Sequence, residues 1–520
     1  MSDDAARTPV IVGVGQVNDR PKDPREGLDP IGLMEAALRE ADRDAGTGWI
    51  SRLDSLAVVD QLSFRELGDV SGPLAARLGV TPKLCYKSTY PGGDTPILML
   101  NEAARRIAGG EIQVAAIAGG EALRTAAQLA ALKAGDDPSA HNPLRRATGR
   151  AGPPSFRQRY GLTAPVDVYP LYENAGRAAY GQTFAEAQAE SGEIWSRFSQ
   201  VAAENPGAWI RKLTPPEAIV TPSADNRPIA FPYNKLMVAN SSVNQGAGFI
   251  VTSLAAAREA GIPEDRLVFV GAGAAAHEPG DYLRRDRYDR SVSMAVSLNR
   301  AMALNGVSAS DLDFVELYSC FPCVPKMARR VIGWAVEKPA TVFGGLTFGG
   351  GPVGNYMSHA VVGMVLKLRE SGRKGLLFAN GGYATNNHTI VLSREPFPLD
   401  VVRSDFDFQS EADAAREPVP ELDETYIGPG TIETYTVLYE RDGRPKFGVV
   451  VGRGPAGQRF LAKVPPSDEA AIDFLTDGKS EPVGSSGVAA LGPGGDCVWS
   501  IKGAATGLGA LPAGTSGTKA

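Results

Sequence analysis

The sequence has few of the residues that build metal sites and disulfide scaffolds. Its 520 residues include only four cysteines and four histidines. Four cysteines are too sparse for a disulfide scaffold and fit a reducing compartment, so we expect a cytoplasmic protein. Zinc motifs need ligands at close spacing, and no two histidines lie that close: His141, His277, His359 and His388. We therefore expect no metal site.

Long apolar runs and an excess of positive charge are also absent. No run approaches the roughly 18 apolar residues of a membrane-spanning helix, so no integral membrane contact is expected. The acidic opening MSDDAARTPV does not resemble a signal peptide. The 53 lysines and arginines are outnumbered by 59 acidic residues, giving a net charge of -6. This balance provides no basic surface for nucleic acid.

The length predicts two to four structural units. Residues 8–17 and 55–62 read as buried strands, and residues 29–42 have the apolar spacing of a helix. Alternating strands and helices are typical of a parallel α/β sheet covered on both faces. We expect an N-terminal α/β half (1–120 plus 241–262), a mostly helical insertion (121–240) and a second α/β half (263–396).

The composition changes after residue 396. Residues 397–425 are rich in Asp, Glu and Pro, which suits a linker or a wrapping segment. Residues 426–503 alternate β-forming residues with turn signals, which predicts a small β-barrel-like domain. The tail, 504–520, is rich in Gly, Ala, Ser and Thr and is expected to be disordered.

An internal repeat links the two α/β halves. Residues 92–120 and 350–382 both run from Gly-Gly through a helix pattern and a polar turn to an apolar strand and a second Gly-Gly. Each copy lies late in its own half, so we interpret the repeat as a duplication. In the first copy, GGDTP predicts a helix entry with Thr95 as N-cap and Pro96 in the first turn.

Three motifs, in this order and spacing, carry a family resemblance: NSSVNQGAGFIVTS (240–253), VELYSCF (315–321) and GGPVGN (350–355). Together they resemble the thiolase superfamily over roughly residues 8–396. The extra β module makes the chain similar to the thiolase-like proteins of type 1, relatives of the sterol-carrier-protein type. The resemblance implies a five-layered αβαβα fold of two duplicated halves, a helical loop-domain insertion and a small C-terminal OB-like domain.

The resemblance also implies where catalytic groups would lie. Thiolases use a cysteine at a helix N-terminus as nucleophile, a histidine that activates it, a second cysteine and an Asn or His of the oxyanion hole. The corresponding positions here are Gly93 (Gly92 if the turn slips by one), Gly351, Ala379 and Tyr318. Ordinary thiolase activity through a cysteinyl intermediate is therefore not expected.

Three functions stay open. The first is an acyltransferase-like protein, similar to acetyl-CoA acetyltransferases, that binds CoA or a lipid-derived acyl-CoA thioester without a covalently bound cofactor. The second is a retro-aldol lyase on β-hydroxyacyl-CoA that uses Tyr318. The third is a non-catalytic subunit or scaffold. The sequence leaves monomer and dimer open.

Candidate catalytic residues are Tyr318, as hydrogen-bond donor or general acid/base, and His388. Both residues could instead have a purely structural role. Tyr318 would then be a buried side chain that fills the volume of the missing family side chain, and His388 a strand-end histidine bonded to backbone. The CFPC pair Cys320 and Cys323 matches a family motif and needs no redox role. Candidate CoA contacts, each with packing or surface charge as alternative, are Arg227, Phe231, Lys235, Ser242, Gly92 and Gly93.

Overall fold

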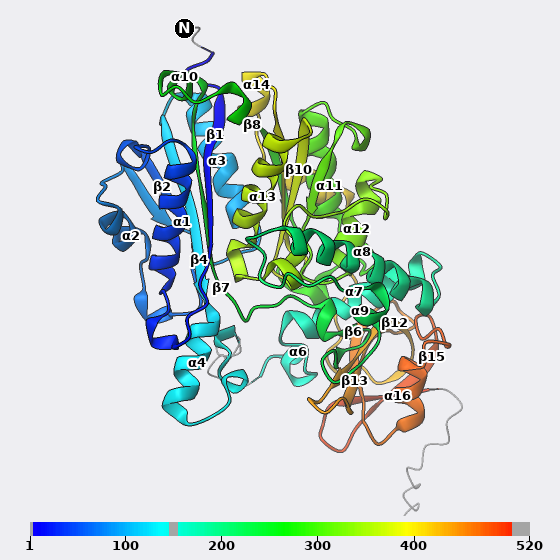
Figure 1. Ribbon diagram of the computed structural model, residues 1–520. Helices are drawn as coiled ribbons and strands as arrows, with labels where there is room; N and C mark the ends of the chain where they lie inside the picture. The colour runs from blue at the N-terminus through cyan, green and yellow to red at the C-terminus, as the bar shows by residue number, and fades with distance from the viewer. Residues whose placement is uncertain (1–3, 145–153, 502–520) are drawn as a thin grey trace, which may run out of the picture.

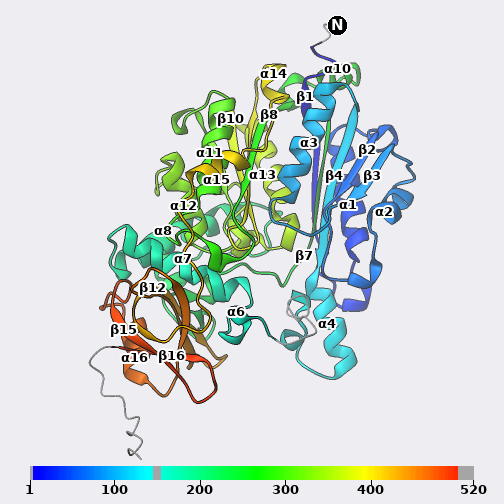
Figure 2. The ribbon, with the colours of Figure 1, turned by 180° about the vertical axis from the view of Figure 1, so that it is seen from behind.

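The computed structural model describes residues 4–144 and 154–501. It has a large α/β body and a small β-barrel at one end, which is orange to red in the ribbon (Figures 1 and 2). The tail expected at 504–520 lies outside the described residues.

Nine strands form the sheet system of the body. Five belong to the first half: β1 (Pro9–Asn18), β2 (Ser55–Val58), β3 (Leu84–Lys87), β4 (Val114–Ala122) and β7 (Asn244–Ser253). Four belong to the second: β8 (Val268–His277), β9 (Phe314–Leu317), β10 (Lys374–Gly381) and β11 (Asn386–Ser393). The strand order is β3-β2-β4-β7-β1-β8-β11-β10-β9.

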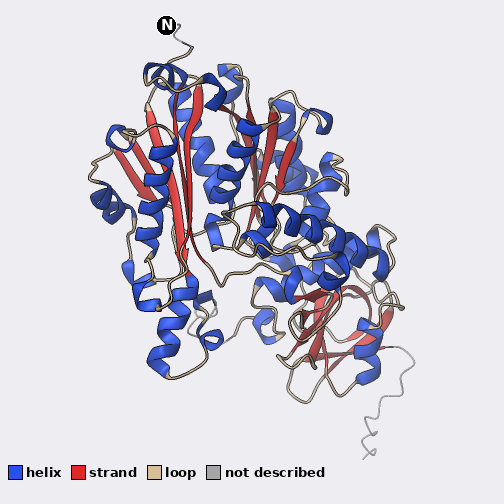
Figure 3. Cartoon of the chain, in the orientation of Figure 1, coloured by secondary structure: helices blue, strands red, loops and turns tan. Residues whose placement is uncertain are grey.

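The two halves meet through a short strand pairing. β1 and β8 share only the residue pairs Val10–Phe269 and Ile11–Val268. The strands therefore stand as two groups that diverge below this junction (Figure 3).

The helices complete five layers. α3 (Thr95–Gly109) and α13 (Tyr356–Glu370) pack against each other and against strands of both halves. α1 (Pro30–Asp44) covers the outer face of the first group of strands, with α2 (Ser71–Leu78) beside it. α11 (Val292–Leu304) covers the second, with α12 (Cys323–Ile332) beside it. The expected five-layered thiolase fold is confirmed.

The sequence repeat accounts for the central layer. Its two copies correspond to α3 with β4 and to α13 with β10. Both helices bury side chains around most of their circumference, from Ile97 to Ala108 in α3 and from Met357 to Leu368 in α13. A helix that is apolar on all sides must be enclosed by other layers.

The inserted region is mostly helical. It contains α4 (Leu123–Ala134), α6 (Phe156–Arg159), α7 (Pro165–Ala179), α8 (Phe184–Glu204) and α9 (Pro216–Val220), then the short strands β5 (Pro228–Ala230) and β6 (Tyr233–Asn234). α10 (Leu254–Glu259) follows β7. The segment after residue 396 forms α14 (Leu399–Val402) and α15 (Gln409–Ala415), and between them Phe406 and Phe408 exchange backbone hydrogen bonds with Ala275.

The C-terminal domain is a closed five-stranded barrel. Its strands are β12 (Gly428–Tyr439), β13 (Pro445–Arg453), β14 (Arg459–Val464), β15 (Ser486–Leu491) and β16 (Cys497–Ile501), and α16 (Glu469–Thr476) lies between β14 and β15. The ring order is β12-β13-β14-β16-β15, and β15 returns to β12. This closed arrangement confirms the OB-like barrel expected from the sequence.

The barrel is joined to the α/β body by a strand pairing and by buried hydrogen bonds. Strand β5 of the insertion pairs with β12, and the Phe231 N–H donates to the carbonyl of Val437 at 2.8 Å. Arg459 is fully buried, pairs with Glu433 at 2.6 Å and donates to the carbonyl oxygens of Leu283 and Arg285, each at 2.6 Å. The barrel and the α/β body therefore share a polar, buried contact.

Candidate functional site

The mouth of α3 (residues 92–94) is a glycine turn that ends in an acidic residue. The N–H groups of Ile97 and Leu98 donate to the Asp94 carbonyl, each at 3.1 Å, so Asp94 takes the N-cap position. The helix thus begins one residue earlier than the Thr95 cap predicted from the sequence. Pro96 lies in the first turn as expected, where its missing N–H costs nothing.

Tyr318 fills the space in front of Gly93. A β-carbon on Gly93 would lie 2.5 Å from the Tyr318 hydroxyl and 2.2 Å from the carbonyl oxygen of Asn380. Tyr318 directly follows β9, and its N–H donates to the Phe378 carbonyl of the neighbouring strand at 3.1 Å. The ends of β9 and β10 thus aim the tyrosine at the helix mouth, and no side chain fits at residue 93.

Two hydrogen-bond donors at the mouth are unpaired. Within residues 4–144 and 154–501, neither the Tyr318 hydroxyl nor the Gly93 N–H has a hydrogen-bond partner. Burial raises the pKa of Tyr318 well above 10, and the nearby Cys320 and Asp94 raise it further. The hydroxyl is therefore protonated at neutral pH. It can donate to a ligand oxygen beside the N–H.

Asp94 adds an acid beside these donors. Its side chain is 8 % exposed, and Oδ1 has no hydrogen-bond partner among the described residues. Burial raises the pKa of Asp94 to about 6. A β-carbon on Gly381 would lie 2.5 Å from Oδ1, so only glycine at that position leaves room for the carboxyl. At neutral pH the carboxylate is mostly ionised and can accept a proton.

A buried acid, Glu316, holds the tyrosine that packs against Tyr318. Tyr356 packs edge-on against Tyr318, with ring centroids 5.7 Å apart, and donates its hydroxyl to Glu316 at 2.6 Å. Glu316 also accepts from the Thr341 hydroxyl and the Val342 N–H, each at 2.8 Å. Burial raises the pKa of Glu316 to about 7. This network fixes the ring against which Tyr318 rests.

Gly351 is hydrogen-bonded to the segment that carries Ser242. The Gly351 N–H donates to the Asn240 carbonyl at 2.8 Å. Two residues further on, Ser242 lines a cavity of about 440 Å³ together with Arg124. Hydroxyl and guanidinium groups are suited to polar and phosphate groups of a ligand. The other residues that line this cavity are Leu123, Ala127, Gln128, Asp137, Pro138, Asn142 and Ser241.

His388 does not lie at the mouth of α3. It pairs with Ala379 in the β10–β11 register, and its Nε2 contacts Asn101 Nδ2, in the second turn of α3, at 3.2 Å. Its ring stacks on Phe406 with centroids 5.5 Å apart. Burial lowers the pKa of His388 to about 3, so the ring is neutral.

Three of the predicted CoA contacts lie near the barrel or on the surface. Phe231 is 8 % exposed and stacks between Phe184 and Tyr435 of β12, with centroids 5.2 and 6.0 Å apart. Arg227 donates to the Pro228 carbonyl at the start of β5, and Lys235 is exposed after β6. The structure does not bring these three together with Tyr318.

Cys320 and Cys323 are both free and buried. Burial raises the pKa of Cys320 to about 12 and that of Cys323 well above 9. Since the thiolate is the reactive form, neither cysteine is poised for redox chemistry.

Comparison with known proteins places this chain in a family. The family model for the thiolase-like protein type 1 additional C-terminal domain matches residues 407–489. The crystal structure of a monomeric SCP2-thiolase-like protein type 1 from Mycobacterium smegmatis is 31 % identical, with a TM-score of 0.80. That match covers 96 % of this chain and 100 % of the other. The chain belongs to the thiolase-like protein type 1 family.

More distant structures share the fold of this family member. The Ltp2-ChsH2(DUF35) aldolase has a TM-score of 0.56 at 17 % identity, over 75 % of this chain and 98 % of the other. Human mitochondrial 3-ketoacyl-CoA thiolase in complex with CoA also has a TM-score of 0.56, at 13 % identity and with the same coverage. A search of curated proteins finds no match. No helix in the described ranges is long and apolar enough to cross a membrane.

Proposed function

We propose that this protein binds CoA or an acyl-CoA thioester at the mouth of α3 without forming an acyl-enzyme. The observation that carries the proposal is the filled space at Gly93, where the resemblance to thiolases implies the nucleophile. A cysteine there would overlap both the Tyr318 hydroxyl and the Asn380 carbonyl. Gly351 and Ala379, at two further family positions, cannot take part in proton transfer through their side chains.

The unpaired donors at the mouth suit a thioester carbonyl. The Gly93 N–H and the Tyr318 hydroxyl would donate to its oxygen, as an oxyanion hole does. Ser242 and Arg124 line the cavity proposed for the pantetheine and phosphate groups. Arg227, Phe231 and Lys235 remain proposed contacts for the distal end of CoA, and Gly92 remains a proposed contact at the mouth of α3.

Thermal stabilisation tests this binding. The folded protein is melted with CoA, acetyl-CoA and a long-chain β-hydroxyacyl-CoA side by side. A ligand at 100 times its Kd stabilises the folded state by about 2.7 kcal/mol, so binding raises Tm in proportion to the logarithm of ligand concentration. No shift with any ligand up to millimolar concentration would refute the proposal and favour a non-catalytic scaffold.

Asp94 beside Tyr318 favours a second candidate, a retro-aldol lyase. The Asp94 carboxylate would take the proton of the β-hydroxyl group while the bond between Cα and Cβ breaks. A carbonyl forms at Cβ, and the electron pair moves to the thioester enolate, held by the Gly93 N–H and Tyr318. The protonated Asp94 then returns its proton to Cα, which leaves an acyl-CoA and a free aldehyde or ketone.

Product analysis tests the lyase. The wild-type protein should release acyl-CoA and a carbonyl compound from a β-hydroxyacyl-CoA, and Asp94→Asn should lower the rate by about 100-fold or more. Tyr318→Phe keeps the ring in place and should also lower the rate. Equal rates in all three proteins would eliminate the lyase, while ligand binding without turnover would leave the first proposal in place.

A further inference from the structure

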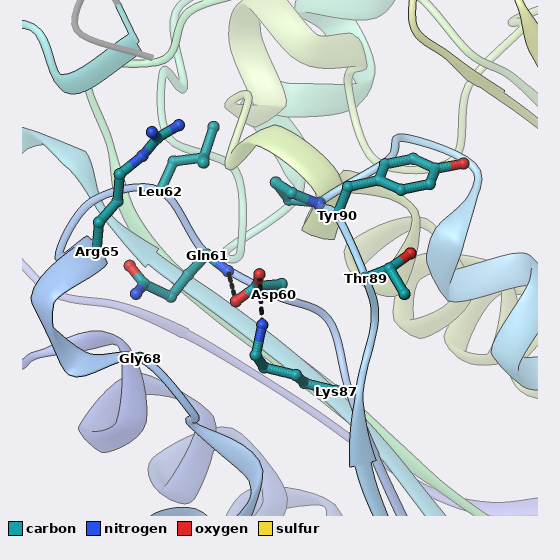
Figure 4. Close-up of a pocket in the computed structure, with 9 residues that line it drawn as sticks. Asp60, Gln61, Leu62, Arg65, Gly68, Lys87, Thr89 and Tyr90 are labelled. Atoms are coloured by element: carbon teal, nitrogen blue, oxygen red, sulfur yellow. Dashed lines mark hydrogen bonds and ion pairs between the residues drawn. The ribbon is translucent and has the colours of Figure 1, made fainter.

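A cavity of about 590 Å³ lies directly before the mouth of α3, where β2 and β3 end (Figure 4). Tyr90 and Pro91 line it and lead into Gly92, whose N–H donates to the Tyr90 carbonyl at 3.0 Å. Ligands of parallel α/β sheets bind at this edge of the strands, and the volume suits a small molecule. The other residues that line it are Asp60, Gln61, Leu62, Arg65, Gly68, Lys87 and Thr89.

The charged residues that line this cavity, Asp60, Arg65 and Lys87, give it a net positive charge. Lys87 and Asp60 form an ion pair of 2.8 Å that lies between Arg65 on one side and Tyr90 on the other (Figure 4). The Arg65 guanidinium has no ion-pair or hydrogen-bond partner in the part of the chain that the structure describes. Filling the cavity with a plain aliphatic tail would remove water from these charges without replacing its hydrogen bonds.

Side-chain hydrogen bonds hold the backbone of the loop that precedes Arg65. The buried Glu121 accepts the N–H groups of Leu62 and Ser63 at 2.8 and 3.0 Å. The Gln61 side chain bonds both the N–H and the carbonyl of Phe64, at 2.8 and 2.7 Å. Arg65 follows at once in a short turn, so its backbone is ordered before a ligand arrives, which lowers the entropic cost of binding.

We propose that this cavity binds a carboxylate at the far end of the acyl chain, so that the ligand is an acyl-CoA thioester whose acyl group ends in a carboxylate. This inference rests on the proposed function, because it assumes that the thioester lies at Gly93 and Tyr318. From there the chain passes Tyr90 into the cavity. The Arg65 fork offers two parallel N–H donors to the carboxylate.

Two ligands of equal chain length test the carboxylate site. Adipoyl-CoA and hexanoyl-CoA are titrated calorimetrically into the full-length protein. The wild type should bind adipoyl-CoA about tenfold more tightly, since a charge-assisted bidentate contact contributes this much. In Arg65→Gln the tenfold preference should vanish while hexanoyl-CoA affinity stays the same.

A matched control is Arg43→Gln, which removes an exposed arginine from α1, on the outer layer. It should keep the full preference. Equal affinity for both ligands in the wild type, or a preference that survives Arg65→Gln, would overturn the inference. Melting temperatures of both variants check that they fold.

Free adipate separates this inference from the proposed function. Binding of hexanoyl-CoA without any carboxylate preference leaves the proposed function standing and removes the carboxylate site. Failure of every CoA ligand, with adipate still bound in an Arg65-dependent manner, removes the proposed function and supports the site. Failure of both the CoA ligands and adipate overturns both.

Discussion

The Tyr318 hydroxyl lies 2.5 Å from the position that a β-carbon on Gly93 would take. These two residues come from different halves of the chain, one before α3 and the other after β9. Their contact closes the position where a nucleophilic side chain would stand. Beside the buried carboxyl of Asp94 it leaves two donors that have no partner among the described residues, the Gly93 N–H and the Tyr318 hydroxyl. The proposed binding of a thioester without acyl transfer follows from this arrangement.

The first prediction concerns the closed position itself. Gly93→Ala should lower the free energy of unfolding by about 2 kcal/mol or more, because the Asn380 carbonyl is backbone and cannot turn away. Gly93→Cys should be at least as unstable and should not acquire thiolysis of acetoacetyl-CoA. Urea unfolding measures the loss.

Gly280→Ala is the control for this substitution. Among the described residues no atom lies within 4 Å of a β-carbon at Gly280, and the residue needs no positive φ. Its stability should stay close to that of the wild type. A Gly93→Ala protein as stable as Gly280→Ala would mean that Tyr318 and Asn380 do not fill the space beside Gly93.

The second prediction concerns the pH dependence of stability. The pKa of Glu316 is raised by burial from 4.5 to about 7, so the stability it contributes is complete below pH 4.5 and is lost as the pH rises through 7. Glu316→Gln removes this loss, which is on the order of 3 kcal/mol. Urea unfolding at pH 5 and pH 8 should show a smaller decline in the variant.

Two other buried acids contribute to the same decline. The pKa of Asp94 is raised to about 6 and that of Glu121 to about 7, both by burial. The Glu316→Gln protein should therefore keep part of the pH dependence. An unchanged decline would show that the pKa of Glu316 is not raised in the folded protein.

The third prediction concerns the cavity that Ser242 lines. Arg124 is exposed at its rim and suits a phosphate, so Arg124→Gln should weaken CoA binding several-fold by calorimetry. Ser242→Ala should weaken it by a smaller factor. Lys235→Gln tests whether the distal end of CoA reaches the surface after β6. Wild-type affinity in all three variants would show that CoA does not bind at these residues.

The fourth prediction concerns the barrel. Arg459→Met would leave the Leu283 and Arg285 carbonyls without a donor and remove one of the two arginines that pair with Glu433. Loss of one partner from a buried pair costs about 3–5 kcal/mol. Hydrogen exchange of β12 and β14 should rise in the variant. Unchanged exchange would indicate that the stability of the barrel does not depend on Arg459.

Much of the fold could be predicted because it follows from patterns within short segments. The Gly-Gly repeat and the strand–helix alternation identify α3, α13 and their strands, and turn signals identify the barrel. The N-cap at Asp94 was missed by one residue, since the Thr95 hydroxyl and the Asp94 carboxyl are both acceptable caps by residue type.

The side-chain environments could not be predicted in the same way. Asp94 is buried because Gly381, far along the chain, leaves room for it. Phe231 faces Tyr435 of the barrel, a partner that no local pattern specifies. His388 is at a strand end, but its alternation directs it to Asn101 in α3. Periodicity gives the face of an element and not the long-range neighbour that covers it.

A crystal structure of the protein with a bound acyl-CoA thioester tests the central claim most directly. The account predicts an intact thioester, with its carbonyl oxygen within hydrogen-bond distance of both the Gly93 N–H and the Tyr318 hydroxyl. An acyl group covalently attached to the protein, or a thioester bound away from the mouth of α3, would contradict it.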